Sequence, residues 1–227
     1  MRMKMKKAPH MSTITTYLYR ICIASILIFL IPNTGEGQMY DGFYMGVGVI
    51  HNSIGGDFDG VSFVGGRGVE DAIPKIEDAF GMKFILGFQS DIGSIDFNYS
   101  RSEHDGDWEG IDMPTVFESY NLDLKALLLK DYYTVRPLLA LGFGLNYLTV
   151  EDGSYDGFFV ADSTFEGYAL RAGGGLQVSL HDQIAIDVMA IYRWEKYDRV
   201  EGLVEGDLSD DVDSNGATYS AEVKYIF

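Results

Sequence analysis

The sequence has 227 residues, a length that suits one domain, and its formal net charge of −17 argues against nucleic acid as a partner. Its one cysteine, Cys22, lies near the N-terminus, so no thiol after residue 37 can form a disulfide or bind a metal. No apolar stretch reaches the ~20 residues of a transmembrane helix, whereas 27 glycines and 14% aromatic residues suit a β-rich chain.

Residues 1–37 have the features of a secretory signal peptide, which predicts export through the secretory pathway. Five basic residues precede an apolar run at residues 21–31 that is too short to span a membrane, and a small polar segment ends at Gly37. We place cleavage after Gly37, which removes five basic residues and one acidic residue and leaves a net charge of −21 on a domain of residues 38–227. An uncleaved anchor is the alternative.

From residue 42 onward, apolar and polar residues alternate with period two, as they do in a strand whose two faces meet different surroundings. The first four such stretches cover residues 42–51, 81–90, 94–102 and 117–129. One face of each is apolar or aromatic: Phe43, Met45, Val47 and Val49; Met82, Phe84, Leu86 and Phe88; Ile95, Phe97 and Tyr99; Tyr120, Leu122, Leu124, Ala126 and Leu128.

Four more stretches cover residues 134–148, 168–180, 184–196 and 217–227. Their apolar faces are Val135, Pro137, Leu139, Leu141, Phe143, Leu145 and Tyr147; Leu170, Ala172, Gly174, Leu176 and Val178; Ile184, Ile186, Val188, Ala190, Tyr192 and Trp194; Ala217, Tyr219, Ala221, Val223, Tyr225 and Phe227. In the last stretch only Ile226 interrupts the polar face.

The connections between these stretches alternate in length. Three are tight turns near residues 91, 132 and 182, and four are long loops near residues 52–80, 103–116, 149–167 and 197–216. Short turns on one side and long loops on the other are typical of bacterial outer-membrane barrels. Aromatic residues also gather at both ends of the strands, as in the interfacial girdles of such barrels. We therefore predict an all-β fold, an eight-stranded antiparallel up-and-down transmembrane β-barrel with both ends of the domain on the periplasmic, short-turn side.

A soluble eight-stranded sandwich or lipocalin-like barrel is the alternative fold. Such a fold would bury its apolar face in the interior. Here the opposite face carries charges and many glycines, which suits a narrow polar lumen, and in water the apolar wall would have nothing to pack against.

Eleven charged residues fall on the polar faces and would point into the lumen: Lys83, Asp96, Asp123, Lys125, Arg136, Arg171, Asp187, Arg193, Glu195, Glu222 and Lys224. Because unpaired charges in a dry lumen are costly, we expect an ion-pair network, with Arg171, Arg193, Glu195 and Glu222 near each other. Such a network would block a wide aqueous channel. A charged conduit for small ions is the alternative.

Three segments resemble the small outer-membrane barrels of the OmpA/OmpX and opacity-protein type, a porin-family architecture: residues 42–49, residues 135–138 running into 142–144, and residues 223–227. In that family the terminal aromatic residue is read by the barrel-insertion machinery, which implies that Tyr225 and Phe227 form the insertion signal. The resemblance also implies the outer membrane of a Gram-negative bacterium, with its lipid and lipopolysaccharide as neighbours. Its members include adhesins, packing proteins and unassigned surface antigens, so the resemblance is poor evidence for one function.

The acidic residues concentrate in the four predicted loops, which hold 23 of them against only Arg67, Lys75 and Arg199. An anionic external cap would attract cations and an unknown basic ligand. The alternative is that the acidic loops only keep the surface solvated.

One stretch matches the calcium-loop spacing of an EF-hand: Asp211, Asp213, Asn215 and Gly216, followed by Glu222. We reject the full match because an extended strand from residue 217 would carry Glu222 about 20 Å from Gly216. Asp211, Asp213 and Asn215 remain a weak candidate for a divalent cation. We expect no other cofactor.

Envelope enzymes built on barrels would need Ser, His and a carboxylate together. We place His104 in a loop and His181 in a turn, and His51 has no identifiable third partner, so we expect no enzyme. The function predicted is a structural or surface-binding, adhesin-like role through acidic external loops. A narrow porin-like channel for small solutes and an envelope lipid-modifying enzyme are the alternatives.

Overall fold

The computed structural model describes residues 41–58, 62–64, 70–72, 75–108, 111–129, 134–151, 153–155, 158–160, 163–201 and 206–227. Three predicted features lie outside these residues: the signal peptide at residues 1–37, the turn at residues 130–133 and the basic loop residue Arg67. Within the described part of the chain, no helix has the length and apolar character needed to cross a membrane.

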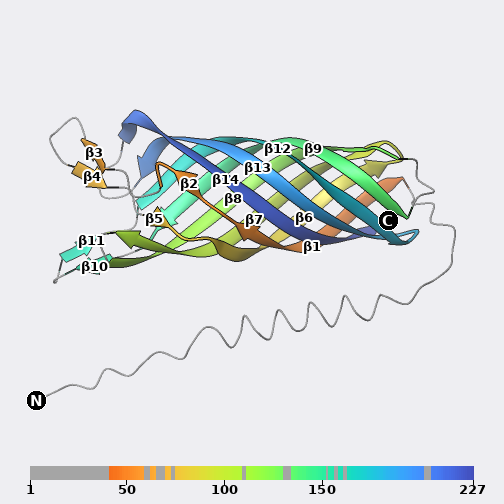
Figure 1. Ribbon diagram of the computed structural model, residues 1–227, viewed down its shortest axis with the longest axis horizontal. Coiled ribbons are helices and arrows are strands. Elements are labelled where there is room, and N and C mark those ends of the chain that lie inside the picture. Colours follow the sequence, from red (N-terminus) through yellow and green to blue (C-terminus); the bar gives the residue numbers. More distant parts are fainter. Residues whose placement is uncertain are drawn as a thin grey trace, which may run out of the picture. The chain divides into compact units, whose positions relative to one another are not determined.

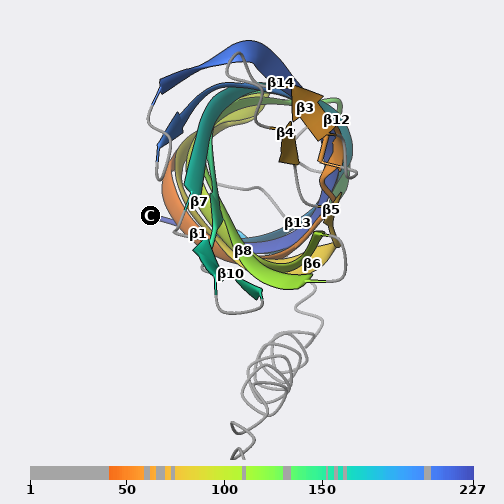
Figure 2. The same cartoon turned by 90° about the vertical axis from the view of Figure 1, so that its left-hand side faces the viewer.

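Eight long strands follow one another around a closed barrel (Figures 1 and 2). They are β1 (Gly42–Asn52), β6 (Ala79–Ser90), β7 (Gly93–Trp108), β8 (Ile111–Leu127), β9 (Val135–Val150), β12 (Ser163–His181), β13 (Ile184–Glu201) and β14 (Gly206–Ile226). Each pairs antiparallel with its neighbour along the chain, and β1 pairs with β14, so the main sheet closes on itself. The predicted eight-stranded antiparallel meander is confirmed.

Six short strands lie at one end of the barrel, which we call the loop end; the opposite end, where β1 begins and β14 finishes, is the turn end. There β2 (Gly55–Gly56) pairs with β14, and β5 (Lys75–Ile76) pairs with β7. Two small hairpins join β3 (Ser62–Val64) to β4 (Glu70–Ala72) and β10 (Gly153–Tyr155) to β11 (Phe158–Val160).

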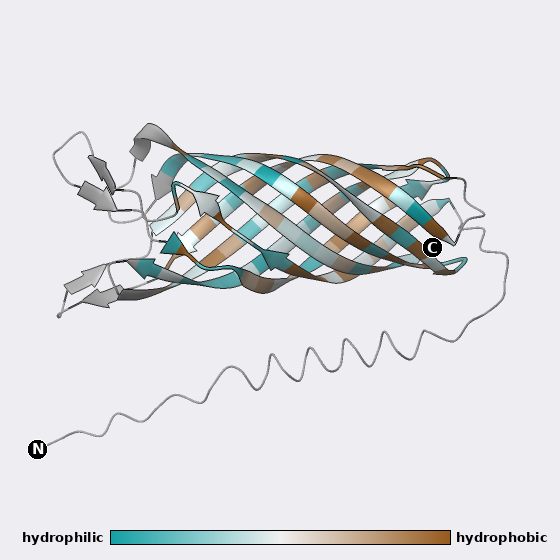
Figure 3. Ribbon diagram, viewed as in Figure 1, coloured by the Kyte–Doolittle hydropathy of each residue, from teal (hydrophilic) through white to brown (hydrophobic). Residues whose placement is uncertain are grey.

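The wall of the barrel has its apolar side chains outside, as the alternation predicts. Leu139, Leu141 and Phe143 are 54%, 66% and 46% exposed, whereas Asp187 and Glu222 are fully buried in the lumen. Figure 3 shows polar and apolar residues alternating along the strands. We call the outward apolar surface the apolar belt. This distribution is the reverse of a soluble barrel, so the soluble alternative is not supported.

Two of the predicted long loops are shorter than expected, because the strands continue beyond the belt. In place of a loop at residues 103–116, β7 runs to Trp108 and β8 begins at Ile111. In place of a loop at residues 197–216, β13 runs to Glu201 and β14 begins at Gly206. Outward apolar residues stop where the belt ends, so the sequence pattern weakens there although the backbone pairing continues.

Candidate functional site

The eleven charged residues predicted for the lumen all point inward, and none is more than 5% exposed. Seven of the eight long strands contribute to this set. Strand alternation explains the placement, since each of these residues is the inward neighbour of an apolar belt residue. The interior of the barrel is therefore the natural candidate site.

Lys125 lies at the centre of the lumen and contacts three carboxylates. Its Nζ is 2.7 Å from Asp96 Oδ2, 3.0 Å from Asp187 Oδ2 and 3.3 Å from Glu222 Oε2. These acids come from β7, β13 and β14, so one ammonium group ties together strands on different sides of the barrel. Three charge-assisted contacts are what a buried lysine needs to remain charged.

Two further lysines complete this group. Lys83 Nζ is 2.6 Å from Glu222 Oε1, and Lys224 Nζ is 2.5 Å from Asp187 Oδ2. Three lysines thus face three carboxylates, and their charges balance. We call these six residues the lysine cluster: Lys83, Asp96, Lys125, Asp187, Glu222 and Lys224.

Among the remaining charges, the four residues expected near each other interact, since the charges of Arg193, Glu195 and Glu222 all act on Arg171, but not all of them are in direct contact. Arg193 Nε is 3.3 Å from Glu195 Oε1, so two of the four residues expected together do pair. Arg171, however, pairs with Asp123 at 3.2 Å, and Glu222 belongs to the lysine cluster. The alternation places side chains in the lumen, but the register decides which of them meet.

A glycine makes the pair between Arg171 and Asp123 possible. Gly142 on β9 lies directly between Asp123 on β8 and Arg171 on β12 in the sheet register. A Cβ atom on Gly142 would lie 2.0 Å from Asp123 Oδ1, which is far inside van der Waals contact. The missing side chain leaves the space through which the arginine reaches the carboxylate across the intervening strand.

Near the turn end, apolar and polar contacts fill the lumen together. Ile226, which interrupts the alternation, points inward and packs with Tyr44 and Ile85. Arg136 donates a 2.6 Å hydrogen bond to Gln177 Oε1 and a longer one to the Asp91 carbonyl of the β6–β7 turn.

The loop end of the lumen is closed by an apolar group that the sequence analysis missed. We call it the apolar plug: Ile54, Phe58, Ile76, Phe117, Leu148, Tyr197 and Val212. The Phe58 ring is fully buried, 5.3 Å from Tyr197 and 5.6 Å from Phe165 between ring centroids. Phe58 lies within the loop predicted at residues 52–80. An aromatic residue among the Gly and Asp residues of that segment is the signal that marks it.

Hydrogen bonds hold the first part of the plug in the barrel mouth. Gly56 has a φ of +78°, a left-handed conformation that suits glycine and turns the chain inward. Arg193 Nη2 donates a 2.8 Å hydrogen bond to the Ser53 carbonyl, and its guanidinium lies 4.7 Å from the Phe117 ring centre. Ser214 Oγ donates to the Gly55 carbonyl at 3.0 Å.

The sequence predicts a loop at His104, but this residue belongs to β7 and points into the barrel. It lies beyond the apolar belt, because the outward residues of β7 are already charged at Arg101. Its Nδ1 donates a 2.7 Å hydrogen bond to the Glu77 carbonyl, which leaves Nε2 to accept one from Ser102 Oγ at 2.7 Å. Asn52 donates to the same Ser102 oxygen at 2.9 Å. Burial lowers the pKa of His104, so the neutral ring is favoured. These contacts attach the end of the segment that joins β1 to β6, at Glu77, to strand β7 of the barrel wall.

The outer surface changes from apolar to acidic at the loop end. On β7, the exposed Glu103, Asp105 and Asp107 continue the outward row that Ile95 and Phe97 occupy in the belt. Six acids of the predicted cap lie outside the described residues: Asp59, Glu109, Asp152, Asp156, Asp162 and Glu205. The described part of the loop end is nonetheless an acidic extension of the barrel, built on strand β7.

The candidate cation residues Asp211, Asp213 and Asn215 lie at alternate positions on β14. Asp213 and Asn215 are exposed, whereas Glu222 points into the lumen. Alternate strand residues are about 6.6 Å apart, so the side chains of Asp213 and Asn215 do not converge as in a calcium loop. Within the described part of the chain, no group of three His, Cys, Asp or Glu side chains could hold a metal ion. Weak cation binding here stays a prediction.

The two residues assigned to the insertion signal are exposed at the turn end. Tyr225 is 44% exposed and Phe227 is 63% exposed, and their rings meet edge to face at 5.3 Å. Their role in membrane insertion stays a prediction.

No protein-family model matches the chain, and no curated protein sequence matches it significantly. Among solved structures it is similar to Neisserial surface protein A, with a TM-score of 0.52, 15% identity, and coverage of 82% of this chain and 97% of that one. It is also similar to the outer membrane protein OprG from Pseudomonas aeruginosa, with a TM-score of 0.50, 13% identity, and coverage of 85% and 98%. The chain has the fold of the small outer-membrane barrels, as the resemblance predicts. A shared fold does not assign a function.

Proposed function

We propose that this protein is an integral outer-membrane barrel that holds an acidic extension at the cell surface for binding cationic or basic partners. The observation that carries this proposal is the contrast between a filled lumen and a charged exterior at the loop end. A barrel whose interior is occupied by its own side chains acts through its outside.

The apolar belt supports the membrane placement. Its exposed apolar side chains have no partner in water, and a bilayer is the surrounding that would cover them. Exposed aromatic residues lie at the turn end, including Phe43 and Phe88, and at the other edge of the belt, including Tyr192 and Trp194. Heat-modifiable migration on a detergent gel, after outer-membrane fractionation, tests this placement.

The filled lumen argues against the channel alternative. Eight strands enclose only enough space for side chains, and here the lysine cluster and the apolar plug occupy it in series. We expect planar-bilayer recordings of the refolded barrel to show no discrete openings. Regular conductance steps would make a channel for small solutes the better-supported function.

The acidic extension is tested with a cationic probe. The barrel in nanodiscs of zwitterionic lipid should bind fluorescent polylysine, and about 1 M salt should abolish binding because the Debye length falls to about 3 Å. Neutralising three outward acids of β7 should weaken binding several-fold: Glu103→Gln, Asp105→Asn and Asp107→Asn. The matched control neutralises three acids at the turn end: Asp41→Asn, Asp91→Asn and Asp182→Asn. Equal losses in both variants would contradict a role specific to the loop end.

The enzyme alternative has one observation to weigh, the hydrogen bond between Ser102 and His104. Both residues are buried, at 1% and 3% exposure, and the imidazole is oriented by a carbonyl rather than by a carboxylate. We therefore propose a structural role for this pair. Mass spectrometry of lipid A from cells with and without the protein tests the enzyme alternative, and a changed lipid A would revive it.

A further inference from the structure

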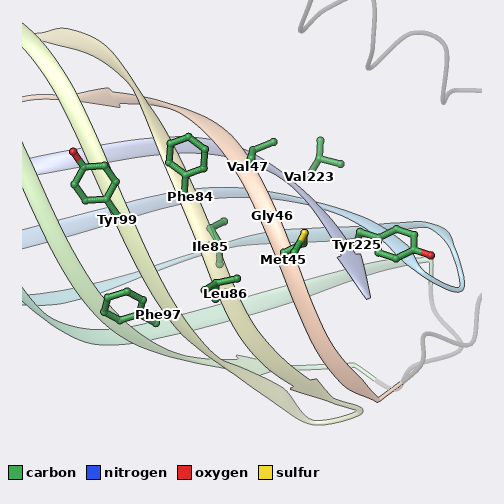
Figure 4. Close-up of a pocket in the computed structure, with 10 residues that line it drawn as sticks. All are labelled: Met45, Gly46, Val47, Phe84, Ile85, Leu86, Phe97, Tyr99, Val223 and Tyr225. Carbon is green, nitrogen blue, oxygen red and sulfur yellow. The ribbon is translucent and has the colours of Figure 1, made fainter. Parts of the chain in front are cut away.

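A groove of about 580 Å³ opens on the outer wall of the barrel, across β14, β1, β6 and β7 (Figure 4). Strand pairing places its lining in two rows that cross these strands. The row nearer the turn end runs from Tyr225 through Met45 and Leu86 to Phe97, and the next row includes Val47 and Phe84.

The groove is elongated across the strands, and its lining is almost entirely apolar. Gly46 and Val47 on β1 are small, while the larger side chains of Phe84 on β6 and Tyr225 on β14 flank them. The rows cross four neighbouring strands, so the groove is roughly 14 Å long at an inter-strand spacing of about 4.8 Å. Half of a hydrocarbon core of about 30 Å has a similar extent, which is the length available to one acyl chain.

The depth of the groove decides which lipid can enter it. Tyr225 is the second-last residue of β14, and Met45 is three residues after the start of β1. On β7, Phe97 and Tyr99 are four and six residues after the start, and Tyr99 is the deepest of these. A strand tilted by about 45° gains about 2.3 Å of height per residue. The groove therefore lies within roughly 14 Å of the turn end, in that half of the belt.

We propose that this groove binds one acyl chain of a glycerophospholipid from the periplasmic leaflet of the outer membrane. The proposal rests on the membrane placement given above, which puts the turn end on the periplasmic side. Glycerophospholipid is the lipid of that leaflet, whereas lipid A belongs to the opposite one. The groove is continuous with the apolar belt. Where the groove meets the turn end, the Tyr225 hydroxyl donates a 3.4 Å hydrogen bond to Gln183 in the β12–β13 turn. The lipid head group would lie at this polar end.

The test fills the groove and leaves the rest of the belt intact. The mature barrel is placed in nanodiscs that contain both phosphatidylethanolamine and lipid A and is released for native mass spectrometry. Val47→Trp occupies the groove, and Val188→Trp is the matched control, because Val188 is similarly exposed (51% against 56%) but lies on β13 outside the groove. Wild type and Val188→Trp should retain one phosphatidylethanolamine per barrel, and Val47→Trp should retain roughly tenfold less, since the indole displaces several buried methylenes.

Three outcomes would overturn the proposal. The two tryptophan variants could retain lipid equally, lipid A could be retained in preference to phosphatidylethanolamine, or Val47→Trp could abolish a dimer, which would make a second copy the occupant. A heat-modifiable gel confirms that each variant is folded. If wild type fails that gel assay, the membrane placement itself is wrong; if it passes and the variants behave alike, only the lipid groove is wrong.

Discussion

The two ends of the lumen are filled in opposite ways. Inside the apolar belt, the interior holds Lys125 and its three carboxylates; beyond the belt, where Glu103 and Asp105 face outward, the interior holds the apolar plug around Phe58 and Phe117. Successive strand residues point to opposite faces, so an apolar outside leaves the polar positions to the inside, and the reverse. The belt is thus an inside-out barrel, whereas the loop end is built like a soluble one.

This difference also changes what holds each region together. The apolar plug gains stability from removing hydrocarbon surface from water, at about 25 cal/mol per Å². The lysine cluster gains little net stability, because its desolvation offsets the attraction between charges, but it tolerates the loss of one member poorly. Substitutions in the two regions should therefore differ in size and in how far their effects spread.

The largest effect should come from Lys125→Met. Removing this ammonium leaves Asp96, Asp187 and Glu222 close together with too few cations, which should lower the free energy of unfolding by about 3–5 kcal/mol. Urea unfolding of the barrel in lipid vesicles measures it. Arg101→Met is the control, because its ion pairs are long and half exposed, and it should cost no more than about 1 kcal/mol. A loss for Lys125→Met no larger than for the control would contradict the role given to the cluster.

Phe58→Ala should have the next largest effect. The cavity left beside Tyr197 and Phe165 should lower the free energy of unfolding by about 3 kcal/mol. This destabilisation should be confined to the loop end. Hydrogen exchange should rise at residues 53–58 and stay unchanged at the belt residues of β9. The exposed Phe84 is the control, and Phe84→Ala should leave the exchange of the plug unchanged. A rise in exchange throughout the barrel would show that the plug and the belt are one cooperative unit.

Gly142→Ala should cost about 2 kcal/mol, because the new methyl group displaces Asp123 and weakens its pair with Arg171. Thermal unfolding in detergent measures the loss. Gly55→Ala is a suitable comparison, since a Cβ at Gly55 meets its nearest atom at an ordinary 3.5 Å. Similar stability of the two variants would mean that the lumen has room to rearrange.

The smallest effect should be a pH dependence confined to the loop end. Burial lowers the pKa of His104 below its unfolded value of 6.5, so the unfolded segment binds the proton more readily. The contribution of neutral His104 to the stability of the loop end is fully present above pH 6.5, and it is lost as the pH falls from there through the pKa of the folded state. Protease sensitivity near residues 75–78 should increase as the pH is lowered from 8 to 5. His104→Gln should remove this dependence, and a pH response that persists in that variant would assign it to another group.

How far the sequence can be interpreted differs between the same two regions. In the belt, strict alternation predicted that Lys83 and Glu222 face the lumen and that Leu141 faces outward, and the structure places them so. At the loop end of β7, polar residues occupy both faces, with Ser102 and His104 inside and Glu103 and Asp105 outside, so the alternation has little hydrophobic contrast. For that reason the pattern predicts a loop at His104, whereas Phe58 lies between two strands, where no alternation applies.

The sequence by itself determined the eight strands within the apolar belt, their order and the face on which each of their side chains lies, because these follow from local alternation and from turn lengths. Only the tertiary structure decided which charges meet, since Arg171 reaches Asp123 through the register that places Gly142 between them. It also decided how the mouth is closed, because the turn at Gly56 brings Phe58 against residues distant in the chain. The pairing of charges depends on register, and the closing of the mouth depends on contacts between distant residues; no local pattern of residues contains that information.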